Sequence, residues 1–176
     1  TQDQLKLIVE DQLVRADLIV ISGESKDESF DLITSVISNL GEIKIVTPKL
    51  VESSKHSFGL IGPDKTPVVV LPGDPIGNFL SAELFIRPII KKMLTGTSTE
   101  RLSKKVKLTK SITSPSGKAQ YLRGNLNSDG QVSPLSDQES LMTLSKANCL
   151  IAISEKEEKI NSGDLVNIIK LNMDKP

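Results

Sequence analysis

The sequence predicts an α/β domain followed by a small β barrel. In the first half, apolar residues at helical spacing alternate with short continuous apolar runs, as in Phe30–Leu40 and then Ile43–Val46. In the second half, the pattern changes to short strands separated by turns such as Asp129-Gly130. Helices alternating with continuous apolar strands indicate a mostly parallel sheet covered on both faces. We therefore expect two domains, over residues 1–98 and 99–176.

The elements of the first domain follow directly from this periodicity. Glycine is expected at Gly41 and Gly96 as the left-handed residue that ends a helix, and Pro88 is expected to kink or shift the last helix. The predicted elements are a helix within 5–14, a strand over 17–21, a helix over 30–40, strands over 43–46, 57–61 and 67–71, and a long helix from about 76 to 94.

The second domain is predicted to be almost entirely β. The Asp129-Gly130 turn joins two strands, and the only helical candidate is Glu139–Lys146. The predicted strands lie at 106–108, 120–126, 131–132, 149–154 and 165–169. Such short, evenly separated strands are typical of a small barrel or sandwich.

Composition narrows the range of functions. Lys+Arg and Asp+Glu each number 22, and this balance argues against a general binder of nucleic acid or anionic membrane. No apolar run reaches the roughly 18 residues that would suggest a membrane span. One cysteine, Cys149, is what a reducing compartment permits, so we expect a cytoplasmic protein with this thiol buried as a small hydrophobe.

Two strand-to-helix loops are the candidate binding elements. In an open parallel sheet, ligands bind at the carboxyl ends of strands, where Ser22-Gly23 and Pro72-Gly73-Asp74-Pro75 are expected. Backbone N–H groups at either loop could cradle a phosphate, although both loops could equally be ordinary turns.

An acidic group follows the first loop, at Glu24, Asp27, Glu28 and Asp31. These carboxylates could hold Mg²⁺ together with substrate phosphates. They could equally be first-turn residues that complement the helix dipole.

Several motifs carry a resemblance to a known family. They are Asp17–Gly23, the segment from Leu71-Pro-Gly-Asp-Pro75 through Phe85-Ile-Arg-Pro88 and, in the β half, Arg123-Gly124, Asp129-Gly130, Ala147-Asn148 and Gly163-Asp164-x-Val166. In this order they resemble the MoeA and gephyrin E-domain family, the molybdopterin molybdenumtransferases. The segment from Leu71 to Pro88 is similar to the family signature LPGNPVS…FELFVRP, and Asp17–Gly23 resembles the strand leading into the GGVSVGxxD loop.

The resemblance implies a fold, a reaction and a set of site residues. The fold would be a MogA/MoaB-like three-layer domain with a mostly parallel sheet that lacks its first strand, followed by the small β barrel. The reaction would be the insertion of molybdate into adenylated molybdopterin, with Mg²⁺ and with release of AMP. Asp31 would be the metal or molybdate carboxylate and Arg123 a cation of the barrel that reaches the cleft. Ser22, Gly23 and the loop Pro72, Gly73, Asp74 and Pro75 would bind the pterin substrate.

Departures from the family pattern raise an alternative function. Glu24 replaces a loop glycine, Asp74 replaces an asparagine, and the two lysines of the KPGKP loop align with Val51 and Ser54, leaving Lys49 and Lys55 as displaced candidates. The alternative is a gephyrin-like scaffold that has lost catalysis and binds a peptide of a partner protein. The resemblance also implies that the chain is the C-terminal portion of a longer, homodimeric protein.

Two further features are interpreted as surface groups. His56 lies in a polar stretch and is expected to be solvated. The basic residues from Lys91 to Lys107 are expected to form a solvated face, with a docking surface for an acidic partner as the alternative.

Overall fold

The computed structural model describes residues 1–23, 27–51, 55–97 and 103–171. The chain divides into two compact units. One comprises Thr1–Pro48 and Ser53–Ser81, and the other comprises Lys49–Glu52 and Ala82–Pro176.

The first unit is built on a four-stranded mixed sheet. Its strands are β1 (Ile19–Ser22), β2 (Gly41–Val46), β3 (His56–Ile61) and β4 (Thr66–Leu71), in the order β1-β4-β3-β2. The strands β1 and β4 pair in parallel, whereas β3 is antiparallel to both β4 and β2.

The expectation of a mostly parallel sheet is therefore wrong for the described strands. Strand β3 is joined to β4 by a tight turn at Gly62, whose φ of 71° suits glycine. A connection this short can produce only an antiparallel pair, since parallel neighbours need a crossover of about a dozen residues. Periodicity identified each strand, and the short connection at Gly62 was the signal that β3 and β4 form an antiparallel pair.

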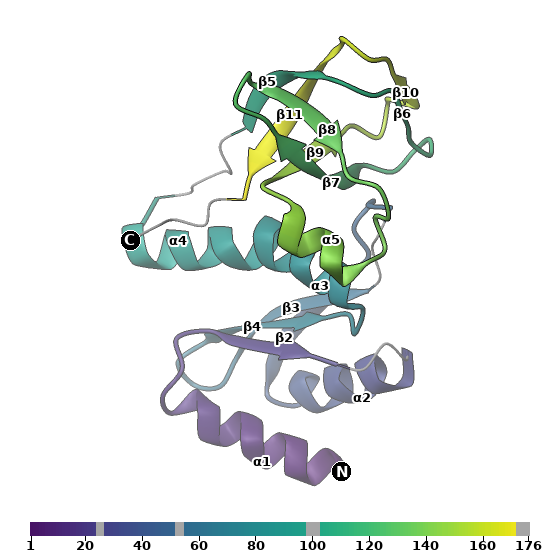
Figure 1. Cartoon of the computed structure of the whole chain (residues 1–176). Helices are drawn as coiled ribbons and strands as arrows, with labels where there is room; N and C mark the ends of the chain where they lie inside the picture. Colours follow the sequence, from purple (N-terminus) through teal and green to yellow (C-terminus); the bar gives the residue numbers. More distant parts are fainter. Residues whose placement is uncertain (24–26, 52–54, 98–102, 172–176) are drawn as a thin grey trace. The chain divides into compact units, whose positions relative to one another are not determined.

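Two helices cover one face of this sheet (Figure 1). Helix α1 (Gln2–Leu13) begins with a capping box between Thr1 and Gln4, and α2 is Asp27–Ser38. The core of this unit consists of apolar side chains from both helices and from the sheet. Its buried members are Val9, Ile19, Phe30, Ile37, Ile61, Val68 and Val70.

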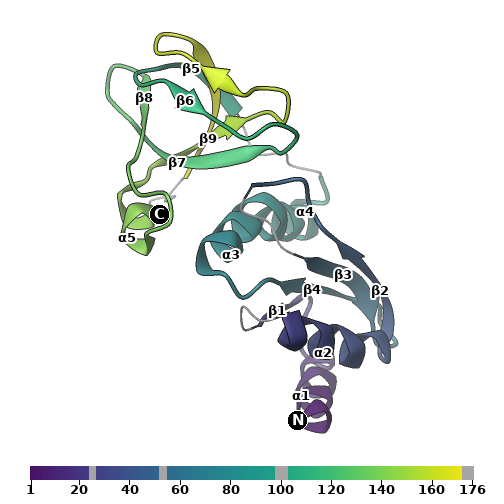
Figure 2. The ribbon, with the colours of Figure 1, turned by 90° about the vertical axis from the view of Figure 1, so that its right-hand side faces the viewer.

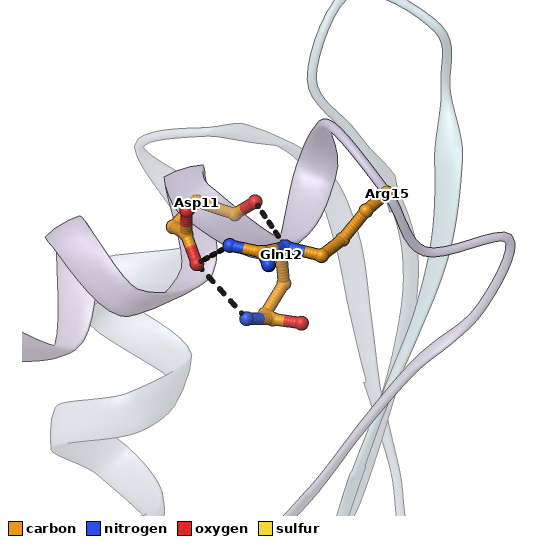
Figure 3. A network of polar contacts seen from close by, with 3 residues as sticks. All are labelled: Asp11, Gln12 and Arg15. Atoms are coloured by element: carbon orange, nitrogen blue, oxygen red, sulfur yellow. Dashed lines mark hydrogen bonds and ion pairs between the residues drawn. The ribbon is translucent and has the colours of Figure 1, made fainter.

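Helix α1 ends in an exposed polar network (Figure 3). The Asp11 carboxylate accepts hydrogen bonds from the Arg15 guanidinium and from the Gln12 amide. Because Arg15 follows Asp11 by four residues, the pair spans one helical turn and stabilises the helix end by a few tenths of a kcal/mol.

A run of helical residues extends without interruption from Pro75 to Thr95. It comprises α3 (Pro75–Ser81), a π-helical turn η1 (Ala82–Ile86) and α4 (Arg87–Thr95). The expected disturbance near Pro88 is confirmed, because the π turn directly precedes the first turn of α4, which contains this proline. Gly96 ends α4 with a φ of 70°, as expected.

The second unit contains a closed five-stranded barrel, and this confirms the predicted barrel (Figure 2). Its strands are β5 (Ser103–Leu108), β7 (Gln120–Leu126), β8 (Gln131–Pro134), β9 (Cys149–Ile153) and β11 (Leu165–Lys170), closed in the order β11-β5-β8-β7-β9. A separate pair joins β6 (Ile112–Thr113) and β10 (Lys159–Ile160), and α5 is Leu141–Lys146.

Branched aliphatic side chains fill the barrel. The fully buried members of this core include Val132, Cys149, Ile151 and Ile168. The expectation that Cys149 is a small buried hydrophobe is confirmed, since its side chain is inaccessible to solvent. Burial raises the pKa of its thiol to about 11.

The predicted role of Gly41 as the residue that ends a helix is wrong. Helix α2 ends at Ser38, and Gly41 is the first residue of β2. A Cβ at Gly41 would lie 2.3 Å from the carbonyl oxygen of Leu60 on β3. The glycine is therefore required by the close approach of two strands.

Candidate functional site

The two predicted loops meet at the carboxyl ends of β1 and β4. These strands are parallel neighbours with Ser22 opposite Leu71, so the chain leaves both strands at the same edge. The Asn78 Nδ2 on α3 donates a hydrogen bond of 2.9 Å to the Ser22 Oγ, which joins the two segments. The structure thus brings Ser22 and Gly23 together with the segment from Pro72 to Pro75.

Within the second loop, Asp74 caps helix α3. Its carboxylate accepts a hydrogen bond from the Gly77 N–H, and its carbonyl accepts one of 2.8 Å from the Asn78 N–H. Gly73 and Asp74 are half-buried, whereas Pro75 is exposed. The negative charge of Asp74 is therefore stabilised at the positive end of the helix.

Asp31 lies on α2 and forms an ion pair with Lys55. Its Oδ1 is 3.6 Å from the Lys55 Nζ, and the two side chains are 62% and 45% exposed. Lys55 directly precedes β3, so the pair links the first loop region to the segment between β2 and β3. An exposed ion pair of this kind contributes about 0–1 kcal/mol to stability. Because both side chains are largely exposed, both groups are accessible to a ligand.

The described residues do not by themselves assemble a magnesium site. Across residues 1–23, 27–51, 55–97 and 103–171, no three side chains of His, Cys, Asp or Glu are placed to hold one ion. Asp31 instead pairs with a cation. The predicted acidic cluster lies partly outside the described residues, at Glu24 and at the side chain of Asp27.

Arg123 lies in β7 of the barrel unit, and its side chain is only 1% exposed. The side-chain amide of Gln138 forms hydrogen bonds with both the N–H and the carbonyl of Arg123. The Gln138 Oε1 accepts from the Arg123 N–H at 2.7 Å, and Nε2 donates to the Arg123 carbonyl at 3.0 Å. The assignment of Arg123 as a cation of the cleft stays a prediction.

His56 is buried rather than solvated, so the surface assignment is wrong. Its Nε2 is 2.6 Å from the Ser81 Oγ on α3, and its ring stacks on Phe58 with the planes 5° apart. A hydrogen-bonded imidazole can be buried at moderate cost. Period-two alternation along β3 places His56 on the same face as the half-buried Phe58 and the exposed Leu60, so this pattern alone did not indicate that His56 is buried.

Among the helices of the described segments, none combines the length and apolar character required to cross a membrane.

Comparison with known proteins agrees with this architecture. Residues 105–171, which span most of the barrel unit, match the family model of the MoeA C-terminal region (domain IV). The chain is 32% identical over 175 residues to molybdopterin molybdenumtransferase 1 of Mycobacterium tuberculosis (strain H37Rv) and 28% identical over 172 residues to molybdopterin molybdenumtransferase 2 of the same strain. These matches cover 94% of the chain but 41% and 42% of the two relatives. The chain therefore spans about two fifths of their length.

Two solved structures are also similar to this chain over nearly its whole length. A crystal structure of a molybdopterin biosynthesis MoeA protein from Pyrococcus horikoshii superposes with a TM-score of 0.77 and 25% identity, covering 96% of this chain and 40% of that one. A molybdenum cofactor biosynthesis protein from Pyrococcus furiosus superposes with a TM-score of 0.69 and 16% identity, covering 97% of this chain and 54% of that one.

The closed barrel, with its match to the domain IV model, has the fold of the C-terminal domain of MoeA proteins. Over nearly its whole length, the chain resembles the C-terminal portion of MoeA-type molybdopterin molybdenumtransferases.

Proposed function

We propose that the protein acts in molybdenum cofactor biosynthesis, where it inserts molybdate into adenylated molybdopterin with release of AMP. The observation that carries this proposal is the junction of the Ser22-Gly23 and Pro72–Pro75 loops at one edge of the sheet, joined by the bond between Asn78 and Ser22. This edge is where open α/β sheets bind nucleotide-like ligands.

The chemistry of this reaction requires groups that hold anions. The substrate carries phosphates and molybdate is itself an anion, so catalysis depends on positioning and on opposing positive charge. In the first unit, backbone N–H groups of the two loops and the Lys55 ammonium supply that charge. Lys55 lies beside Asp31, the residue that the resemblance identifies as the metal or molybdate carboxylate. The proposed substrate-binding unit is the MogA/MoaB-like α/β domain of residues 1–98.

The remaining parts of the proposal come from the resemblance. Mg²⁺ with Asp31 as a ligand, Arg123 as a cation of the cleft, a homodimer and a cytoplasmic location are all predictions. The single buried thiol of Cys149 supports the last of these, because it is the cysteine content that a reducing compartment permits.

Calorimetric titration of the full-length protein with AMP and molybdate tests the proposal. We expect saturable AMP binding, weakened at least tenfold by Lys55→Ala, because a hydrogen bond to a charged group contributes about 1.5–3 kcal/mol. Lys65→Ala is the matched control, since Lys65 is exposed and lies at the opposite, amino-terminal end of β4. Absence of AMP binding by the folded full-length protein would overturn the proposal.

A second candidate is a catalytically inactive scaffold that binds a peptide of a partner protein. Two observations favour it: the Asp31 carboxylate is already paired with Lys55, and the proposed substrate loop carries the additional negative charge of Asp74. Asp31→Ala separates the two candidates. The variant should lose molybdate-dependent AMP release in the first case, and it should leave peptide binding unchanged in the second.

A further inference from the structure

His56 lies in one row of the sheet with the ends of the two strands that precede the candidate loops. Ser22 ends β1 and stands opposite Leu71, which ends β4. On the other side of β4, Ser57 stands opposite Val70, and the antiparallel register then brings His56 opposite Leu71. The first residue of β3 therefore lies at the edge where the two candidate loops meet.

Helix α3 is bonded to both ends of this row. The Asn78 Nδ2 donates a hydrogen bond of 2.9 Å to the Ser22 Oγ. The Ser81 Oγ lies 2.6 Å from the His56 Nε2. Because Asn78 and Ser81 are three residues apart, they lie on the same side of the helix. One helix thus joins β1 to β3 across the end of β4, the strand between them.

The contact between His56 and Ser81 is excluded from solvent. The two residues are 1% and 3% exposed, and the imidazole stacks on Phe58 with the ring centroids 6.1 Å apart. Groups buried this deeply do not touch a ligand at the edge. A buried hydrogen bond does fix position, because water cannot replace a partner that moves away. His56 can therefore act on the site only by holding its neighbours in place.

Lys55 is the neighbour that carries a charge. Successive residues of an extended chain point to opposite faces of a sheet. His56 contacts α3 on one face, and the Lys55 Nζ lies 3.6 Å from the Asp31 Oδ1 of α2 on the other. A lysine side chain is long and rotatable, so the reach of its ammonium is defined only when its Cα is fixed. The bond of His56 to Ser81 fixes the chain one residue away.

We propose that His56 is a positioning residue, which holds the Lys55 ammonium at this edge of the sheet so that it can bind a phosphate of the substrate. The inference rests on the proposed function, in which the same edge binds adenylated molybdopterin and releases AMP. Helix α3 begins at Pro75, the last residue of the second loop. The same helix therefore sets the position of both loops and, through His56, that of Lys55.

A double-mutant cycle on the full-length protein tests this role. Ser81→Ala should weaken AMP binding about fivefold in calorimetric titrations, as is typical of groups in one contact network. In a Lys55→Ala background, the same replacement should change the affinity less than about twofold, because the ammonium that the contact positions is gone. A merely structural contact would weaken binding equally in both backgrounds, and that result would refute the proposal. Thr66→Val is the matched control and should leave the affinity unchanged, since it alters another buried hydroxyl residue of this sheet at the amino-terminal end of β4.

A second variant separates position from stability. Ser81→Ala alone removes one partner of a buried contact and should lower the melting temperature. His56→Phe combined with Ser81→Ala makes both partners apolar and keeps a ring against Phe58, so it should recover most of the stability in thermal circular dichroism but not the AMP affinity. Recovery of both would contradict the positioning role. Absence of AMP binding by the wild-type protein would overturn the proposed function and the inference with it, whereas equal losses in both backgrounds of a protein that binds AMP would overturn the inference alone.

Discussion

Replacing Gln138 with alanine should destabilise the barrel by about 2–4 kcal/mol. The side-chain amide makes three hydrogen bonds: from the Arg123 N–H at 2.7 Å, to the Arg123 carbonyl at 3.0 Å and to the Leu135 carbonyl at 2.6 Å. Each such bond contributes about 0.5–1.5 kcal/mol, and a buried N–H left without a partner costs about 1–3 kcal/mol. The cost of the unpaired N–H already includes the loss of its own hydrogen bond, so the expected loss of stability is about 3 kcal/mol.

The physical reason lies in how β7 is paired just beyond the end of β8 at Pro134. The Leu135 N–H donates to the Arg123 carbonyl at 2.9 Å, which is one half of an antiparallel pair. The amide of Gln138 completes the other half, because it accepts from the Arg123 N–H and donates to the Leu135 carbonyl. Alanine removes both its donor and its acceptor.

Urea unfolding followed by tyrosine fluorescence measures this loss. Tyr121 is the only tyrosine, no tryptophan is present, and it lies in β7 two residues from Arg123. Gln131→Ala, at an exposed position of the same barrel, is the control and should change stability by less than about 0.5 kcal/mol. A loss for Gln138→Ala no larger than that of the control would refute the assignment of this amide to the ladder.

Three further predictions concern other parts of the chain. Asp74→Asn should leave the free energy of unfolding within about 0.5 kcal/mol, because asparagine caps a helix as well as aspartate does. It should also tighten AMP binding, measured by calorimetry, since a negative charge is removed beside the proposed ligand. Barrel stability should fall as the pH rises from 9 to about 11, because the buried Cys149 thiol stays protonated when folded and ionises at lower pH when unfolded. Cys149→Ala should reduce this fall in urea titrations at several pH values. Gly59→Ala should destabilise the first unit by about 1–3 kcal/mol in thermal circular dichroism, since a Cβ would lie 2.4 Å from the Glu42 carbonyl oxygen.

Each of these predictions has a clear contrary result. Weaker AMP binding by Asp74→Asn would mean that the carboxylate helps to hold the nucleotide. A pH dependence that is the same in Cys149→Ala would assign the alkaline loss of stability to other groups. An unchanged melting temperature for Gly59→Ala would mean that β2 and β3 can separate at little cost.

Periodicity was sufficient to predict most elements and the barrel. The strands at β4 and β9 are continuous apolar runs, and the helical spacing of α2 is regular, so burial could be inferred from local sequence alone. The antiparallel pairing of β3 with β4 could have been inferred from the short connection at Gly62, which the expectation of a mostly parallel sheet did not take into account. The parallel pairing of β1 with β4 joins residues far apart in the chain, and such pairing leaves no periodic signal in one sequence.

The sequence predicted only part of the candidate site. Ser22 and the loop from Pro72 to Pro75 follow the ends of two strands, and this position predicted that they would meet. The ion pair of Asp31 with Lys55 and the hydrogen bonds of Gln138 join residues far apart in the chain. Such contacts depend on tertiary geometry, so the sequence offered Lys55 only as a displaced candidate and did not indicate the contacts of Gln138.

The order in which the barrel strands are synthesised has a consequence for incomplete chains. Strand β11 comes last and pairs with both β5 and β9, so the barrel cannot close until Lys170 has been made. A product terminated before Leu165 would leave two strands with open edges and an exposed apolar interior. Unpaired edges of this kind promote aggregation. Loss of only these last six barrel residues should therefore send the protein to the insoluble fraction, even though most of its length is intact.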